Sequence, residues 1–285
     1  MRRRPANIVL LTLILFCSWL AVAAKGPGRA GRPEIVAHRG ASYDAPENTL
    51  ASVNLAWQRK SPAVEVDVYL SADGHIVVYH DKTTERIGGR NRGVKDQTLA
   101  ELRELDAGSW KSPRFKGELI PTLPEVLETV PAGGRLFIEI KDGVELVPSL
   151  VELLEQWQHT RRRAVVIAFS YDVAKAVKKS IPEIPVYWLV KFEQSKTDGS
   201  WEPDIGGVIA RTREAGLDGI DTNFSAMVTE ELIARVHAEG LGYYVYTVDD
   251  PRDARYLRDA GIDGITTNRP AWLKREMRGG GAGGK

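Results

Sequence analysis

Cysteine is almost absent from this chain, which has one such residue, Cys17, among 285. Cys17 lies in an apolar N-terminal segment, and Phe16 precedes it where a bacterial lipoprotein signal requires a small residue. We therefore expect neither a disulfide framework nor thiol chemistry in the folded domain.

Net charge is also nearly absent, because 39 basic residues face 38 acidic ones and the formal charge is +1. The sequence thus lacks the basic excess that is typical of proteins binding nucleic acid or an anionic membrane surface. We predict a small-molecule partner and no nucleic acid, and the sequence does not define an oligomeric state.

One long apolar run is present at residues 8–24, behind three arginines at positions 2–4. The small residues Ala21, Val22 and Ala23 near its end are typical of a cleaved export signal. We predict a signal peptide over residues 1–24 and a periplasmic or extracellular protein. The alternative is an uncleaved anchor, which would be the only contact with a membrane. Residues 25–33 are predicted as a linker, 34–277 as one catalytic domain and 278–285 as a flexible tail.

Between these ends, strand-like apolar runs alternate with helix-length segments. This alternation is typical of βα units around a parallel sheet, and eight strands predict a (β/α)8 barrel. An open, doubly wound sheet is the alternative. The predicted strands are 34–38, 63–70, 135–140, 164–169, 185–190, 217–221, 241–248 and 263–267. The predicted helices are 49–60, 123–130, 144–159, 172–180, 205–215, 229–239 and 251–260.

The second strand is followed by features that interrupt this pattern. Residues 76–80 predict a short strand that extends the second strand as a hairpin. Residues 81–121 are polar, rich in glycine and long for a connection between a strand and a helix. We predict that they form a lid or small insertion over the site.

Carboxylates alternate with valines in the second strand. Period-two alternation places Val64, Val66 and Val68 on one face and Glu65 and Asp67 on the other. If the valines contact the helices, the carboxylates face the barrel interior, where unpaired negative charge is very costly. A hard divalent cation, Ca²⁺ or Mg²⁺, would neutralise them.

The third strand also places two charged side chains on one face, because Glu139 and Lys141 are two residues apart near its carboxyl end. Active sites of such barrels gather at that end of the strands. Glu139 would complete a three-carboxylate cation site, and Lys141 would oppose the remaining charge of a phosphate. The alternative is a layer of structural ion pairs within the barrel.

Two histidines, His38 and His80, end the first strand and the hairpin extension, and Arg39 follows the first of them. An imidazole titrates near neutral pH, so each histidine can take or give a proton. The arginine can hold a phosphate through paired hydrogen bonds. Together with the carboxylates, these residues predict a metal-assisted phosphodiesterase.

An ordered series of motifs resembles the glycerophosphodiester phosphodiesterases, a family with the (β/α)8 barrel of phospholipase C-like phosphodiesterases. The resemblance covers residues 34–275. It implies that His38 and His80 are the acid–base pair, and that Glu65, Asp67 and Glu139 hold one divalent cation. It also implies that Arg39 and Lys141 contact the phosphate, with Glu47 orienting Arg39 or binding the metal. The motifs are His38-Arg39-Gly40, residues 45–49, Glu65-Val66-Asp67-Val68, Asp73-Gly74, residues 77–81 and residues 137–141.

One stretch departs from the family pattern. Members commonly have a tryptophan followed by Thr-Val-Asn near the end of the seventh strand, whereas this chain has Tyr246-Thr247-Val248-Asp249. Tyr246 is therefore only a possible substrate contact. The activity implied by the resemblance is hydrolysis of glycerophosphodiesters to glycerol 3-phosphate and an alcohol.

Three rival functions remain open on the sequence. A headgroup phosphodiesterase acting on phospholipid, lysophospholipid or sphingomyelin would need a membrane-docking face, for which only residues 190–203, with Phe192 and Trp201, offer a place. A non-catalytic phosphodiester-binding protein would need neither histidine. A barrel that abstracts a carbon-bound proton would need a base on the later strands, and strands five to eight show no clear ionisable base.

Overall fold

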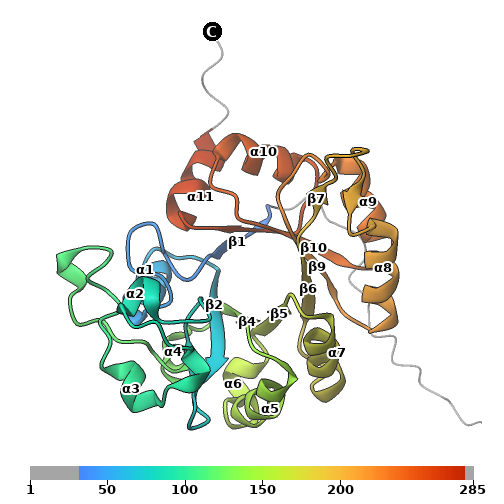
Figure 1. Cartoon of the computed structure of the whole chain (residues 1–285). Helices are drawn as coiled ribbons and strands as arrows, with labels where there is room; N and C mark the ends of the chain where they lie inside the picture. The colour runs from blue at the N-terminus through green and yellow to red at the C-terminus, as the bar shows by residue number, and fades with distance from the viewer. Residues whose placement is uncertain (1–31, 280–285) are drawn as a thin grey trace, which may run out of the picture.

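The computed structural model describes residues 32–279, whose strands form a closed barrel (Figure 1). Eight parallel strands follow the order β1-β11-β10-β9-β6-β5-β4-β2, and β1 also pairs with β2, which closes the ring. The predicted (β/α)8 barrel is confirmed, and its closure excludes an open sheet. The barrel strands are β1 (Glu34–Ala37), β2 (Ala63–Leu70), β4 (Arg135–Ile140), β5 (Ala164–Ala168), β6 (Val186–Val190), β9 (Gly219–Asn223), β10 (Gly242–Tyr246) and β11 (Gly264–Thr267).

Helices surround the strands (Figure 1), and five of them begin at a residue whose side chain caps the helix. Side-chain oxygens of Thr49, Ser170, Asp204, Thr229 and Asp250 each accept a backbone N–H of the helix that follows. Every predicted helix is present, and α11 is an addition to the prediction. The main helices are α1 (Leu50–Gln58), α4 (Leu123–Thr129), α5 (Val147–Gln156), α6 (Gln158–Arg161), α7 (Tyr171–Ser180), α8 (Ile205–Glu214), α9 (Glu230–Ala238), α10 (Pro251–Asp259) and α11 (Pro270–Gly279), and a 3-10 turn, η3 (Val144–Leu146), precedes α5.

The core has two main layers. Val64, Val66 and Val68 join the large cluster between the strands and the helices, as the alternation predicts. Ala63, two residues before Glu65, belongs instead to the smaller cluster that fills the barrel interior. The face of β2 that carries the carboxylates therefore points inward.

The segment after β2 is a folded insertion. β3 (Ile76–Val78) pairs with β2 in the antiparallel direction, as predicted for the hairpin. The following residues, predicted as a lid or small insertion, contain short helical pieces beside the barrel (Figure 1) and a separate hydrophobic cluster that includes Tyr79, Val94 and Leu102. These pieces are α2 (Glu85–Gly88), η1 (Val94–Asp96), α3 (Leu99–Arg103) and η2 (Pro113–Phe115).

A second excursion follows β6, where β7 (Glu193–Gln194) and β8 (Trp201–Glu202) form a small hairpin. Within residues 32–279, no helix combines the length and the apolar character needed to cross a membrane. The predicted signal peptide and the end of the predicted tail lie outside the described residues.

Candidate active site

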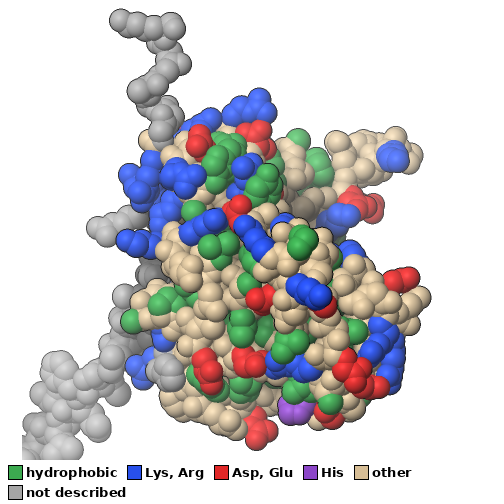
Figure 2. Space-filling view, turned by 90° about the vertical axis from the view of Figure 1, so that its left-hand side faces the viewer, with side chains coloured by type: hydrophobic (Ala, Val, Ile, Leu, Met, Phe, Trp, Pro, Cys, Tyr) green, Lys and Arg blue, Asp and Glu red, His purple; other side chains and the backbone are tan. Residues whose placement is uncertain are grey.

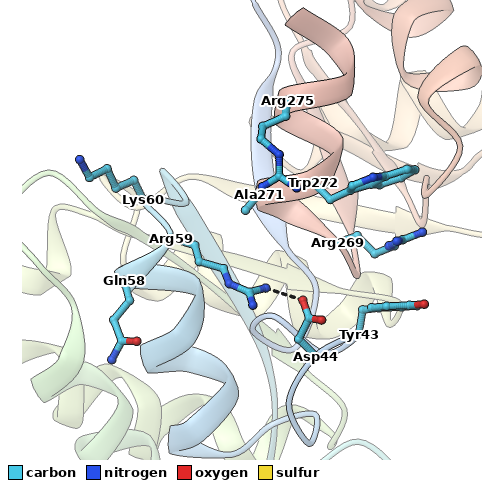
Figure 3. A pocket seen from close by; sticks show the side chains of 9 residues that line it. All are labelled: Tyr43, Asp44, Gln58, Arg59, Lys60, Arg269, Ala271, Trp272 and Arg275. Atoms are coloured by element: carbon cyan, nitrogen blue, oxygen red, sulfur yellow. Dashed lines mark hydrogen bonds and ion pairs between the residues drawn. The ribbon is translucent and has the colours of Figure 1, made fainter. Parts of the chain in front are cut away.

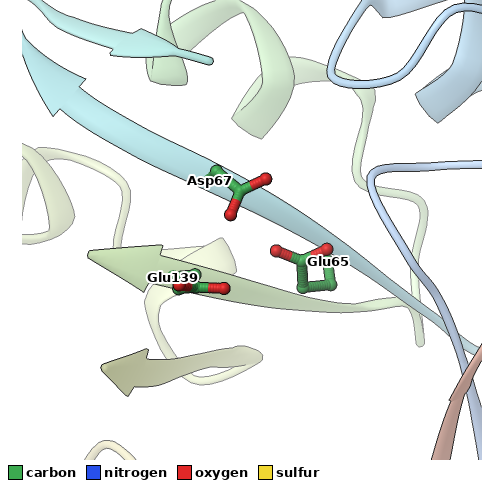
Figure 4. Close-up of side chains that lie close together, drawn as sticks. All are labelled: Glu65, Asp67 and Glu139. Carbon is green, nitrogen blue, oxygen red and sulfur yellow. The ribbon is translucent and has the colours of Figure 1, made fainter. Parts of the chain in front are cut away.

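Three carboxylates from two neighbouring strands meet inside the barrel (Figure 4). Glu65 and Asp67 lie on β2 and Glu139 lies on β4, where the strand register pairs it with Asp67. One oxygen of each carboxylate lies within 4.8 Å of the other two, and all three residues are buried. This group could hold a hard divalent cation, which binds to oxygen ligands.

Two observations support the fit of a cation to this triad. Glu65 Oε1 and Asp67 Oδ1 are buried and accept no hydrogen bond, which is costly for an anionic oxygen. In addition, burial and the charge of Asp67 raise the pKa of both glutamates, that of Glu139 to about 8 and that of Glu65 well above its usual range. A bound cation would remove both penalties.

Two basic side chains flank the triad. The backbone N–H of Arg39 donates to Glu65 at 2.8 Å, and its guanidinium lies 3.3 Å from Asp67. Lys141 donates to Glu139 at 2.7 Å and lies 3.5 Å from Asp67. Burial opposes ionisation of Asp67, but the charges of Arg39 and Lys141 outweigh it and lower the pKa of Asp67. Asp67 is therefore the member of the triad that remains ionised.

His38 is held by a chain of hydrogen bonds that starts at Asp249. The Asn268 side-chain amide and backbone N–H both donate to the Asp249 carboxylate, at 2.7 and 2.9 Å. The Asn268 oxygen consequently faces His38 Nδ1, at 2.7 Å, and also accepts from Ser42. Because that oxygen can only accept, we assign the His38 proton to Nδ1, which leaves Nε2 as a proton acceptor. Burial, followed by the Arg39 charge, lowers the pKa of His38 to about 4.

His80 has a different partner, because its Nδ1 lies 2.6 Å from the carboxylate of Asp81. Asp81 in turn accepts from Arg86 at 2.5 Å. Arg86 also donates to Glu47 at 2.7 Å, and Glu47 accepts from Arg39 at 2.8 Å. Glu47 thus lies beside Arg39 and outside the triad, a position suited to orienting the arginine.

Tyr246 lies on the wall of the site. Its ring contacts Phe169 edge-on, with centroids 6.0 Å apart, and Lys141 lies 5.7 Å from the Phe169 ring. The Tyr246 hydroxyl is buried and has no hydrogen-bond partner. Its role as a substrate contact stays a prediction.

A buried carboxyl lies where the sequence prediction has none. Asp221 on β9, the sixth barrel strand, is 1% exposed, and burial together with the charge of Glu139 raises its pKa well above the usual range. The sequence-based expectation that strands five to eight show no clear ionisable base did not consider this carboxyl. The prediction ended that strand at Asp221, whereas β9 continues to Asn223 and places Asp221 inside the barrel.

The residues that hold the two histidines are also absent from the sequence-based prediction. The contact between Asp81 and His80 could have been predicted because the two residues are adjacent in the sequence. Asn268 and Asp249, in contrast, lie 230 and 211 residues from His38. No local pattern links positions so far apart. In the loop considered for membrane docking, Phe192 is 2% exposed and Trp201 is partly buried against the main core.

A model of the glycerophosphoryl diester phosphodiesterase family matches residues 38–272. The chain belongs to this family. The match includes both histidines, the acidic triad and Asn268. The family resemblance seen in the motifs is thereby confirmed.

Individual members of the family resemble the chain over different lengths. A glycerophosphodiester phosphodiesterase of Caldanaerobacter subterraneus is 38% identical over 159 residues, a match spanning 53% of this chain and 64% of that relative. One of Bacillus subtilis is 30% identical over 259 residues, covering 84% of this chain and 85% of the relative. The solved structure of an Oleispira antarctica phosphodiesterase in complex with the product sn-glycerol-3-phosphate has a TM-score of 0.74 and 28% identity, and covers 86% of this chain and 97% of that one.

Proposed function

We propose that this protein hydrolyses glycerophosphodiesters to glycerol 3-phosphate and a free alcohol. The observation that carries the proposal is an acidic triad inside the barrel with two imidazoles that have chemically different partners. The product bound in the Oleispira antarctica relative supports the same product here.

Glu65, Asp67 and Glu139 would hold one divalent cation, Ca²⁺ or Mg²⁺. When bound, the cation supplies a positive charge that polarises the phosphoryl group. Arg39 and Lys141, which flank the triad, would contact the phosphoryl oxygens and stabilise the charge that develops on them. Glu47 would keep the Arg39 guanidinium in place through their 2.8 Å hydrogen bond.

His38 is assigned as the general base. Its pKa of about 4 keeps the ring neutral at pH 7, and the Asn268 oxygen fixes the proton on Nδ1. Nε2 is then ready to accept a proton from the nucleophile, which is water or the 2-hydroxyl of the glycerol. Asp249 acts as a positioning residue because it sets the orientation of the Asn268 amide.

His80 is assigned as the general acid. The Asp81 carboxylate accepts from Nδ1 and interacts favourably with a protonated ring, so that Nε2 can donate a proton to the leaving alkoxide. Asp81 is itself held by Arg86. The two histidines thus differ in the charge of their partners, an amide in one case and a carboxylate in the other.

A panel of glycerophosphodiesters, assayed for release of glycerol 3-phosphate with and without a chelator, tests the activity. His38→Ala and His80→Ala should each lower kcat by at least about 100-fold with the fold intact. Full activity in excess chelator would refute the cation's role. Hydrolysis of sphingomyelin or lysophospholipid without hydrolysis of glycerophosphodiesters would refute the proposed substrate.

The leaving group separates the two histidine roles. An ester of 4-nitrophenol needs little protonation of its leaving group, so His80→Ala and Asp81→Asn should retain most of their activity on it, whereas His38→Ala should not. The reverse pattern would exchange the two assignments. Equal losses on both substrate types would contradict an acid role for His80.

A further inference from the structure

A basic groove lies outside the barrel, between α1 and α11 (Figure 3). Its volume is about 550 Å³, and none of the triad or histidine side chains lines it. Four cationic side chains and one anionic side chain line the groove. They are Arg59, Lys60, Arg269 and Arg275, with Asp44 as the single acid.

Most of this positive charge is uncompensated. Asp44 forms its ion pair with Arg59. Among residues 32–279, Lys60, Arg269 and Arg275 have no acidic partner, and Lys60 and Arg275 are exposed. The Lys60 carbonyl, at the C-terminal end of α1, is bonded by Lys274 at 3.2 Å. The groove therefore combines an excess of positive charge with unused hydrogen-bond donors.

Arg269 is held in a fixed orientation. Its guanidinium lies 4.2 Å from the centroid of the Tyr43 ring and 3.9 Å from that of Trp272. Stacking covers the faces of a guanidinium and leaves the N–H groups at its edge available. An arginine held in this way loses little conformational freedom when it forms paired hydrogen bonds to an anion.

The surroundings extend the positive region. Lys111 and Arg114 from the insertion donate to the carbonyls of Ser42 and Asp44, at 2.7 and 2.6 Å, on the loop that borders the groove. Ala271 places the first turn of α11, with its partial positive charge, at the wall. Lys and Arg side chains also gather on this side of the molecule in the space-filling view (Figure 2).

We propose that the groove between α1 and α11 binds a phosphate group, as a free phosphate or phosphate monoester or as the headgroup of an anionic phospholipid. Three unpaired cations, one of which is the oriented guanidinium fork of Arg269, match the charge and the geometry of phosphate oxygens. This site is separate from the proposed catalytic centre, although the loops that carry Tyr43 and Arg269 also carry His38 and Asn268.

Acetylation of individual lysines, followed by mass spectrometry of the purified protein, tests the proposal. Lys60 reports on the groove, and exposed Lys179 on α7, across the barrel, is the control in the same molecule. At an inorganic phosphate concentration about nine times its Kd, acetylation of Lys60 should slow about tenfold, because one tenth of the grooves remain empty. Lys179 should be unaffected.

The source of the phosphate is distinguished by parallel incubations. Protection of Lys60 by inorganic phosphate or glycerol 3-phosphate assigns the site to a soluble ligand. Protection only by phosphatidylglycerol vesicles, and not by phosphatidylcholine vesicles, assigns it to a lipid headgroup. Protection in neither incubation overturns the proposal, as does equal slowing of Lys60 and Lys179 or equal protection by acetate.

Two variants connect the protection to the groove. Arg275→Gln removes an exposed cation that has no acidic partner among residues 32–279. This variant should lose most of the protection of Lys60. Arg269→Lys keeps the charge but removes the planar fork, and it should weaken the protection. Thermal unfolding checks that both variants are folded, and full protection in the two folded variants would refute the site.

Discussion

Binding of a divalent cation to the acidic triad should release protons, and the number released should depend on pH. In the metal-free protein, the pKa of Glu139 is about 8 and that of Glu65 is well above its usual range, whereas that of Asp67 is lowered. At pH 7 Glu139 is therefore mostly protonated, and the raised pKa of Glu65 favours its protonated form as well. A carboxyl group must lose its proton to bind a metal, so cation binding should release at least about one proton at this pH.

The sign of the pH dependence follows from the raised pKa values. As the pH falls, cations compete with protons for Glu65 and Glu139, and the affinity should decrease. Between pH 7 and pH 6 the loss should be at least about tenfold, or about 1.4 kcal/mol. Above pH 8 the number of protons released should fall by about one, because Glu139 is then ionised before the cation binds.

Isothermal titration calorimetry with Mg²⁺ or Ca²⁺ measures this number directly. The observed enthalpy, plotted against the ionisation enthalpy of several buffers at one pH, has the number of released protons as its slope. Glu139→Gln should release about one proton fewer, and Glu152→Gln, which changes an exposed glutamate on α5, should behave as the unsubstituted protein. A slope near zero together with an affinity that is independent of pH would refute the reasoning.

Three further predictions concern single residues. Asp249→Asn should lower kcat at least about tenfold because the Asn268 amide loses its fixed orientation. Asp250→Asn, which changes the cap of α10 and its ion pair with Arg252, should leave kcat unchanged; steady-state kinetics tests both. Glu139→Gln should stabilise the metal-free protein by about 1–3 kcal/mol at pH 9 but little at pH 5. A carboxyl whose pKa is raised in the folded protein disfavours folding once the pH exceeds its pKa in the unfolded chain. Urea unfolding in the presence of chelator measures the gain, and an equal gain at both pH values would contradict the prediction. Leu136→Ala, at a fully buried position on β4, should cost about 2–5 kcal/mol in urea unfolding while kcat of the folded protein is retained.

The inward carboxylates could be predicted from the sequence because their arrangement depends on local geometry. Successive side chains of a strand point to opposite faces, so three valines on one face of β2 suffice to direct Glu65 and Asp67 to the other. Glu139 follows from the same rule and from the tendency of parallel strands to align their carboxyl ends. The barrel itself follows from the regular alternation of strands and helices.

Contacts between distant parts of the chain could not be predicted from these rules of local geometry. Asn268 reaches His38 only because β11 and β1 are neighbours in the closed barrel, and Asp249 joins them from the loop after β10. The basic groove has the same origin, since Arg59 and Lys60 come to lie near Arg269 and Arg275 only after the barrel closes and places α1 and α11 on either side of the groove. A balanced overall charge hides this clustering, because composition carries no information about position.

Because the insertion has a hydrophobic cluster of its own, we expect it to open separately from the barrel. Its core, around Val94 and Leu102, does not overlap with the cluster between the strands and the helices. Arg86, which holds Asp81 beside His80, belongs to this smaller unit, whereas the triad belongs to the barrel. A transient opening of the insertion would therefore disconnect the proton donor and leave the cation ligands in place, so that amide hydrogens of the two units would exchange with solvent at different rates.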